Sequence, residues 1–365
     1  MRLPFDMVWL SKWLLPLTLL AAPACSERPA SGAESRPPNA PRAAVRQLDS
    51  AALAAVYARA TQLPKLRSLL VSQRDTLVAE RYFGGARADR PANLKSASKS
   101  VVSALVGVAL TAGTLRDLGQ TVGDLLPADA RGLDPAKRAI TVEDLLSMRS
   151  GLESTSIRNY GAWVSSRDWI RYALARPLVA PPGHDGGPMI YSTGNTHLLS
   201  AILTRAAGRS LYRQWAALAR PLGIVPREWP TDPRGVYFGG NEMRMTPREM
   251  LRCGALYLRG GVAPPGTPAA GRRLVPQAWV DSSWVPRTTS GFSGHQYGYG
   301  WWQRDSGGYP VHFAWGYGGQ FIFVVPDLSL VVVATSDPDA PERDHSHLDA
   351  VHALLDAVVE SLRSA

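Results

Sequence analysis

Ser96 and Lys99 are the residues whose types and spacing most directly suggest chemistry. They lie three positions apart at the head of an apolar stretch, residues 101–110, which we expect to be helical. On a helix this spacing places the serine hydroxyl and the lysine amine on one face, within reach of each other. The amine accepts the hydroxyl proton only when it is neutral, and burial or a nearby positive field favours that form by lowering its pKa. The pair is therefore a candidate for catalysis by an activated serine.

A serine three residues before a lysine also arises by chance, most often as a helix cap beside a surface lysine. Two further segments make the pair more specific. Residues 189–196 place Tyr191 at a turn just before an expected helix, and residues 313–320 form a glycine-rich strand end. Glycines at such a position let backbone N–H groups approach a substrate closely.

The ordered motifs resemble those of the serine β-lactamase and penicillin-binding-protein superfamily, in its class C, esterase and 6-aminohexanoate-dimer-hydrolase branch. The resemblance covers residues 46–362 and includes three more segments, at residues 141–152, 243–250 and 297–302. It implies a β-lactamase-like α+β fold and a serine hydrolase that works through an acyl-enzyme, with no metal or cofactor.

The resemblance also implies a role for each site residue. Ser96 would be the acylated nucleophile, Lys99 would lower its proton affinity, and Tyr191 would act as general base and then as acid toward the leaving group. The backbone N–H groups of Ser96 and Tyr317 would form the oxyanion hole. Three residues would contact the substrate: Asn195, Trp315 and Gly316.

Two departures from the class C pattern bear on the substrate. Thr193 stands where the tyrosine motif of those enzymes ends in asparagine, and Ala314 stands where their strand motif begins with the lysine that holds the β-lactam carboxylate. Ala314 and Trp315 cannot supply that charge, so we expect an uncharged ester or a linear amide as substrate. We expect Asn195 to take over part of the role of the missing asparagine. Three alternatives stay open: a β-lactamase, a D,D-peptidase, and a catalytically silent envelope protein that binds a peptide or glycan.

Other kinds of site are disfavoured. The stretch at residues 344–349 contains a His-x-His-x-Asp pattern, but Ala350 follows where a zinc site would continue with histidine, so we expect solvated histidines at a helix start. We expect His312 to be an ordinary strand histidine. No Gly-x-Ser-x-Gly elbow, phosphate loop or dinucleotide fingerprint occurs in the sequence.

The composition agrees with an enzyme of one large domain or two lobes. The 365 residues are 45% hydrophobic and 19% charged, which is enough to bury a sizeable core. Of the 40 Lys and Arg residues only five are lysine, which leaves 35 arginines; these are scattered without a basic run, so the net charge of +10 does not indicate nucleic-acid binding. In such a chain Lys99 stands out, because arginine cannot lose its proton.

The amino terminus predicts export. Residues 1–25 combine a charged start, an apolar run of about ten residues and small residues before Cys25, which is typical of a signal peptide of the lipoprotein type and too short for a membrane span. Simple cleavage after Ala24 is the alternative. Residues 26–46 read as a flexible linker, and the predicted location is the periplasm or cell envelope, with a lipid on Cys25 as the membrane contact. Cys253 is the sole cysteine of the domain that follows the signal and linker, so this domain has no internal disulfide.

Strand patterns occur at both ends of the remaining chain. We expect a helix at residues 48–62 and a hairpin of residues 68–73 and 76–83, helices between 96 and 257 that include 141–147 and 196–207, and a closing helix at 346–362. Late strands are expected at residues 297–303, 311–314, 320–325 and 328–335. This predicts an α+β fold with an antiparallel sheet built from both chain ends. Within a domain at 47–362, an α/β lobe would comprise residues 47–95 and 270–362, and a mostly helical lobe would comprise residues 96–269.

Overall fold

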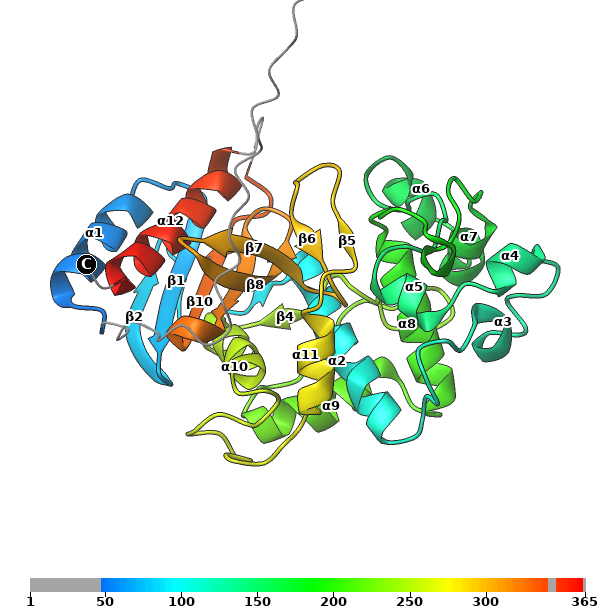
Figure 1. The fold of residues 1–365 in the computed structure, drawn as a ribbon, viewed down its shortest axis with the longest axis horizontal. Coiled ribbons are helices and arrows are strands. Elements are labelled where there is room, and N and C mark those ends of the chain that lie inside the picture. The colour runs from blue at the N-terminus through cyan, green and yellow to red at the C-terminus, as the bar shows by residue number, and fades with distance from the viewer. Residues whose placement is uncertain (1–46, 341–345, 364–365) are drawn as a thin grey trace, which may run out of the picture. The chain divides into compact units, whose positions relative to one another are not determined.

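A large antiparallel sheet is the central element of the computed structural model, which describes residues 47–340 and 346–363. Its strand order is β2-β1-β10-β9-β8-β7-β6-β5, and β3 and β4 pair separately (Figure 1). The strands are β1 (Leu66–Gln73), β2 (Thr76–Tyr82), β3 (Ala92–Asn93), β4 (Arg244–Met245), β5 (Thr288–Thr289), β6 (Gln296–Tyr297), β7 (Trp302–Ser306), β8 (Tyr309–Gly316), β9 (Gln320–Val325) and β10 (Leu330–Ser336). Because β1 pairs with β10, the sheet is built from both ends of the chain, as predicted.

Twelve α-helices lie in the described residues. They are α1 (Ser50–Ala60), α2 (Ser98–Thr111), α3 (Val122–Leu125), α4 (Pro135–Arg138), α5 (Val142–Leu146), α6 (Tyr160–Val164), α7 (Trp169–Ala175), α8 (Thr193–Ala206), α9 (Leu211–Ala219), α10 (Pro247–Leu258), α11 (Gln277–Ser283) and α12 (Ser346–Leu362). None of the helices among these described residues is long and apolar enough to cross a membrane. Residues 43–365 form one compact unit, and the boundaries expected for its two lobes stay predictions.

The sheet is buried on both faces because its central strands alternate between two hydrophobic clusters. In β10, Val332 and Ala334 belong to the cluster shared with α1 and α12, whereas Val331 and Val333 belong to the cluster shared with α2 and α10. Successive side chains of a strand point to opposite faces, so a continuous apolar strand fills both clusters. Figure 1 shows α1 and α12 together on one face and α10 on the other.

Two tight turns join neighbouring strands of the large sheet. Arg74 and Asp75, which join β1 to β2, have φ values of 49° and 63°, and Gly307 and Gly308, which join β7 to β8, have φ values of 58° and 87°. Positive φ at both central residues is the conformation whose twist matches the flanking strands of a hairpin. The predicted hairpin of residues 68–73 and 76–83 is confirmed, and β7 and β8 form a second one.

The predicted strand at residues 297–303 is wrong, because the chain turns within it. β6 ends at Tyr297, which pairs with Trp302 at the start of β7. The turn between them is fastened to α2, since the Ser100 hydroxyl donates to the Gly300 carbonyl at 2.6 Å and Ser103 donates to the Tyr299 carbonyl at 2.6 Å. Contacts distant in the chain therefore decide this turn.

Helix α8 begins three residues earlier than predicted. The Thr193 N–H donates to Ser156 Oγ at 3.0 Å, and the Gly194 N–H donates to Thr155 Oγ1 at 2.8 Å. These hydroxyls come from another segment and satisfy N–H groups that a helix start leaves unpaired. By contrast, α5 has the predicted local cap, with Thr141 and Asp144 in a capping box.

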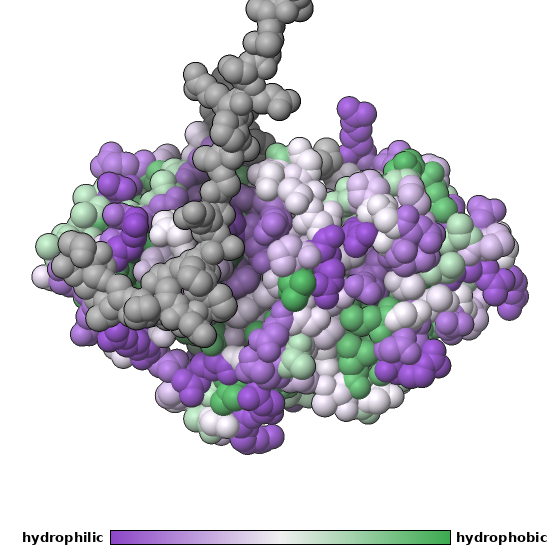
Figure 2. Space-filling model, in the orientation of Figure 1, coloured by the Kyte–Doolittle hydropathy of each residue, from purple (hydrophilic) through white to green (hydrophobic). Residues whose placement is uncertain are grey.

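The surface in view is predominantly hydrophilic. Figure 2 shows hydrophilic residues spread across this face, with hydrophobic residues in small separate groups. Isolated apolar side chains of this kind are normal for a folded domain.

Candidate active site

Ser96 lies at a sharp corner where β3 leads into α2. It is the middle residue of a short 3-10 turn, Lys95–Ala97, directly before α2. Lys95 has a φ of +49°, and its N–H donates to Asn93 Oδ1 at 2.9 Å. The Leu94 N–H donates to the Met243 carbonyl at 2.8 Å. Contacts on both sides of the corner hold this unusual backbone in place.

The Lys99 amine is buried and contacts three oxygens. Its side chain is one helical turn after Ser96, and Lys99 is 3% exposed. Nζ donates to Ser96 Oγ at 3.0 Å, to the Gly240 carbonyl at 2.9 Å and to Thr193 Oγ1 at 3.3 Å. Among the described residues no carboxylate forms an ion pair with it. Burial without a counter-charge lowers the pKa of Lys99 to about 7.

Tyr191 completes a group of three side chains. The Lys99 Nζ lies 5.0 Å from the centroid of the Tyr191 ring. Burial raises the pKa of Tyr191 to about 12, even though a side-chain hydrogen bond with Ser96 acts in the opposite direction. The phenol therefore holds its proton at neutral pH, while a large share of the lysine is neutral. An amine of this kind can accept a hydroxyl proton, and a neutral phenol can donate one.

The end of β8 meets the Ser96 corner at very short range. A Cβ atom added to Gly316 would lie 2.0 Å from the Leu94 carbonyl oxygen, so only glycine fits there. In the chain, Gly316 is followed by Tyr317, whose side chain is 70% exposed, and Leu94 is followed by Lys95 and Ser96. The arrangement is compatible with the predicted use of the Tyr317 and Ser96 backbone N–H groups.

Thr193, and not Asn195, lies against Lys99. We expected Asn195 to take over part of the role of the missing asparagine, but its side chain is buried in the core at 1% exposure. Its Oδ1 accepts a hydrogen bond from the Ser150 hydroxyl at 3.0 Å, and its Nδ2 contacts the Met148 sulfur at 4.0 Å. The first turn of α8 directs the side chains of Thr193 and Asn195 to different places. Thr193, which stands where the class C pattern has asparagine, therefore contacts Lys99 itself.

The Gly240 carbonyl is a further contact of Lys99, which the sequence motifs did not indicate. Gly240 has a φ of +84°, and a Cβ atom on it would lie 2.8 Å from Lys99 Cγ. Gly239 passes equally close to α8, where an added Cβ would lie 2.1 Å from the Thr196 carbonyl oxygen. The adjacent glycines before the 243–250 motif were the available signal for this close approach.

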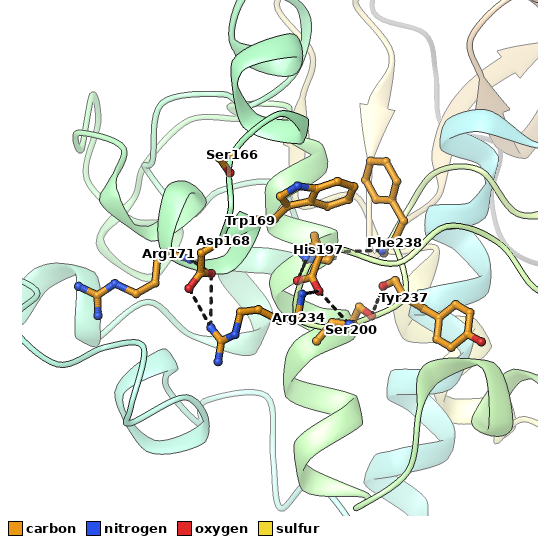
Figure 3. A network of polar contacts seen from close by, with 12 residues as sticks. Ser166, Asp168, Trp169, Arg171, His197, Ser200, Arg234, Tyr237 and Phe238 are labelled. Atoms are coloured by element: carbon orange, nitrogen blue, oxygen red, sulfur yellow. Dashed lines mark hydrogen bonds and ion pairs between the residues drawn. The ribbon is translucent and has the colours of Figure 1, made fainter.

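A buried histidine supports the same loop. His197 on α8 lies among Trp169, Phe238 and other rings (Figure 3), with its Nε2 3.1 Å from Asp232 Oδ2. The Gly239 N–H donates to its Nδ1 at 3.4 Å. Asp232 Oδ1 in turn accepts the Arg234 and Val236 N–H groups, each at 2.8 Å. This network connects the loop that carries Gly240 to α8.

Trp302, the last residue of the motif at residues 297–302, lies beside Tyr191. The Trp302 ring centroid is 5.7 Å from that of Tyr191 and 5.3 Å from that of Trp315. Trp301 is instead a core residue, 4.4 Å from the Tyr257 ring. His312 lies in β8 as predicted and stacks on Trp284 at 4.1 Å.

The described residues contain no group of three or more His, Cys, Asp or Glu side chains that could hold a metal ion. His347 of the His-x-His-x-Asp pattern hydrogen-bonds to Ser336 Oγ at 2.9 Å. Asp344, His345 and Cys25 lie outside the described residues, as do the predicted signal peptide and linker.

Comparisons with known proteins identify relatives of this chain. The chain is 27% identical over 350 residues to a 6-aminohexanoate-dimer hydrolase of Paenarthrobacter ureafaciens. The matched region covers 84% of this chain and 85% of that protein. Its fold is similar to that of a penicillin-binding protein homologue from Caulobacter crescentus, with a TM-score of 0.67 and 17% identity over 87% of this chain and 100% of the other. It is also similar to EstCE1, described as a hydrolase with promiscuous acyltransferase activity, with a TM-score of 0.65 and 17% identity over 84% of this chain and 99% of the other.

The predicted superfamily and fold class are thus confirmed. The Beta-lactamase family model matches residues 60–357, most of the chain, so the protein belongs to the Beta-lactamase family and is a serine hydrolase.

Proposed function

We propose that this enzyme hydrolyses esters or linear amides through an acyl-enzyme on Ser96. The observation that carries the proposal is the buried Lys99 amine, 3.0 Å from Ser96 Oγ and with a pKa lowered to about 7. A serine hydroxyl is a weak nucleophile until a neighbouring base accepts its proton. Lys99 is the base in position to do so.

Acylation begins when Ser96 Oγ attacks the substrate carbonyl carbon and its proton passes to Lys99 Nζ. The carbonyl oxygen becomes negative and receives hydrogen bonds from the Ser96 and Tyr317 N–H groups, which lower the barrier. The carbon–oxygen or carbon–nitrogen bond to the leaving group then breaks as that group receives a proton. Water subsequently attacks the acyl-enzyme, and the same groups work in reverse.

The resemblance implied that Tyr191 acts first as a base. We propose instead that it acts as an acid in the first step, acylation. Its pKa is raised to about 12, so at neutral pH it is a phenol and not a phenolate. We assign the proton acceptor role to Lys99, and Tyr191 passes its proton to the leaving group and is reprotonated from Lys99. Its ring contact with Lys99 places it for this transfer.

An uncharged substrate suits the strand beside the serine. Ala314 is fully buried, and neither it nor Trp315 carries a charge that would hold a carboxylate at that point. The similarity to a 6-aminohexanoate-dimer hydrolase supports linear amides, and the similarity to EstCE1 supports esters. Trp315 and Gly316 are proposed to contact the substrate.

The test is hydrolysis of p-nitrophenyl acetate, 6-aminohexanoate dimer and a penicillin by the purified protein and by Ser96→Ala. We expect ester or linear-amide turnover that Ser96→Ala abolishes while the variant keeps its circular dichroism spectrum. Turnover unaffected by Ser96→Ala would contradict the proposal. Absence of turnover with no covalent fluorophosphonate adduct would instead favour a silent binding protein, and turnover of penicillin alone would favour a β-lactamase.

For the amino terminus we propose export and a lipid on Cys25. The support is the sequence pattern of residues 1–25, followed by the polar stretch 26–46. Incorporation of labelled palmitate that is lost in Cys25→Ala is the expected result. A protein released freely after signal cleavage, without label, would contradict lipidation.

A further inference from the structure

We propose that Phe292, Trp302 and Trp315, here called the aromatic rim, bind a flat apolar leaving group of the substrate, such as an aryl-bearing alcohol or amine. This rests on the proposed function and adds the chemical class of one half of the substrate. Phe292 is the central residue of the proposal, because it is a large apolar side chain left 65% exposed beside the site.

Two members of the rim, Phe292 and Trp302, lie beside the ring of Tyr191, and Trp315 contacts both of them. The Phe292 ring centroid lies 6.1 Å from that of Tyr191, 5.7 Å from that of Trp302 and 6.1 Å from that of Trp315. Phe292 meets Tyr191 at 75° and Trp302 at 76°, in the edge-to-face orientation that aromatic pairs prefer. A flat group entering beside Tyr191 would therefore find ring faces and edges already placed to receive it.

The loop that carries Phe292 is held in one conformation. It joins β5 to β6, and the Ser290 hydroxyl, 2% exposed, accepts the N–H groups of Phe292 and Ser293 at 3.3 and 3.2 Å. The Gly294 N–H donates to the Ser290 carbonyl at 2.9 Å, and Gly294 has a φ of +70°. An exposed aromatic ring on a fixed loop costs little conformational entropy when it binds a ligand.

The position of Tyr191 identifies which half of the substrate meets the rim. Its phenol gives a proton to the leaving group, so the departing oxygen or nitrogen lies next to the Tyr191 hydroxyl in the reacting complex. Side chains packed around Tyr191 are consequently nearest to that group. Next to Ser96 in the chain, Lys95 Nζ forms an ion pair with Glu242 Oε1 at 3.3 Å, and such a pair is a poor surface for an apolar group.

The experiment compares kcat/KM for three esters by pH-stat titration with the full-length protein. Propyl acetate is the reference, phenethyl acetate adds a ring to the alcohol, and propyl 3-phenylpropanoate adds a ring to the acyl half. Phe292→Ala should lower kcat/KM for phenethyl acetate about tenfold and for the other two less than twofold. Ser290→Ala, which removes the hydroxyl that holds the loop, should also lower kcat/KM for phenethyl acetate relative to the other two esters.

Two controls accompany these variants. Leu77→Ala removes another exposed apolar side chain, 39% exposed on the far edge strand β2, and should leave all three values unchanged. Phe292→Leu keeps an apolar side chain without a ring and should give an intermediate ratio, which a folding defect would not. Equal losses for all three esters, or a loss confined to propyl 3-phenylpropanoate, would overturn the inference while leaving the proposed function intact. If the wild-type protein hydrolyses none of the esters or amides, or Ser96→Ala keeps the activity, the proposed function itself fails.

Discussion

Gly316 and Leu94 meet so closely that a single added carbon atom would separate β8 from the Ser96 corner. A Cβ atom on Gly316 would lie 2.0 Å from the Leu94 carbonyl oxygen, a distance that real Cβ contacts do not show. The obstructing atom belongs to the Leu94 backbone and not to a flexible side chain, so it cannot easily move aside. The glycine is thus required for the strand to bring its own N–H groups to the nucleophile.

We expect Gly316→Ala to reduce kcat about a hundredfold, because the added carbon would force apart the two proposed oxyanion-hole donors. The measurement is steady-state ester hydrolysis together with a thermal melt. Gly161→Ala is the matched control, since an added Cβ there meets no atom within 4 Å, and it should keep full activity. Wild-type activity in Gly316→Ala would contradict the assigned oxyanion hole.

The pH profile should have an acid limb near pH 7. Lys99 must be neutral to accept the Ser96 proton, and burial lowers its pKa to about 7. Below that pH the amine is protonated, so log kcat/KM should fall by about one per pH unit. The profile should be recorded with an ester whose own hydrolysis is subtracted. A rate independent of pH between 5 and 9 would exclude Lys99 as the base.

Lys99→Met should remove activity and yet stabilise the fold more at pH 7 than at pH 10. The pKa of Lys99 is lowered from 10.5 to about 7, so between these values the unfolded chain binds a proton that the folded chain lacks. The cost of burying this lysine is therefore complete below pH 7 and disappears above pH 10.5. Melting temperatures of both proteins across this range give the test, and a constant difference would contradict it.

Asp232→Ala should lower the free energy of unfolding by about 3 kcal/mol, because it leaves buried donors without an acceptor. His197 and the N–H groups of Arg234 and Val236 all use this carboxylate. Urea denaturation measures the loss. Asp339→Ala, at an exposed aspartate, serves as the comparison and should cost much less.

The Cys253 thiol should react slowly with a disulfide reagent in the native state. Burial raises its pKa to about 12, and the thiolate is the reactive form. Its sulfur lies 3.7 Å from the Met245 sulfur, in a partly buried setting. Titration with Ellman's reagent before and after denaturation should show reaction mainly in the unfolded protein; a rapid native reaction would contradict this.

Much of the fold could be predicted because its signals are local. Gly307-Gly308 specifies a hairpin turn by its own backbone preferences, and the Thr141 and Asp144 spacing specifies a helix cap. The strand at 297–303 could not be recognised as two strands, because α2 hydroxyls bind the turn from about 200 positions earlier in the chain.

The sequence by itself determined that a serine and a lysine share one face of a helix start, since three residues make one turn whatever surrounds them. It did not determine that the lysine is neutral, nor that Thr193 and Gly240 are the groups that contact it. Those partners lie 94 and 141 positions from Lys99, and they meet it only after the sheet and α8 have packed. The same is true of Phe292, which reaches Tyr191 from a loop about 100 residues later. Spacing is a property of the local chain, whereas desolvation and long-range contacts are properties of the packed interior, and for this reason only the tertiary structure decided them.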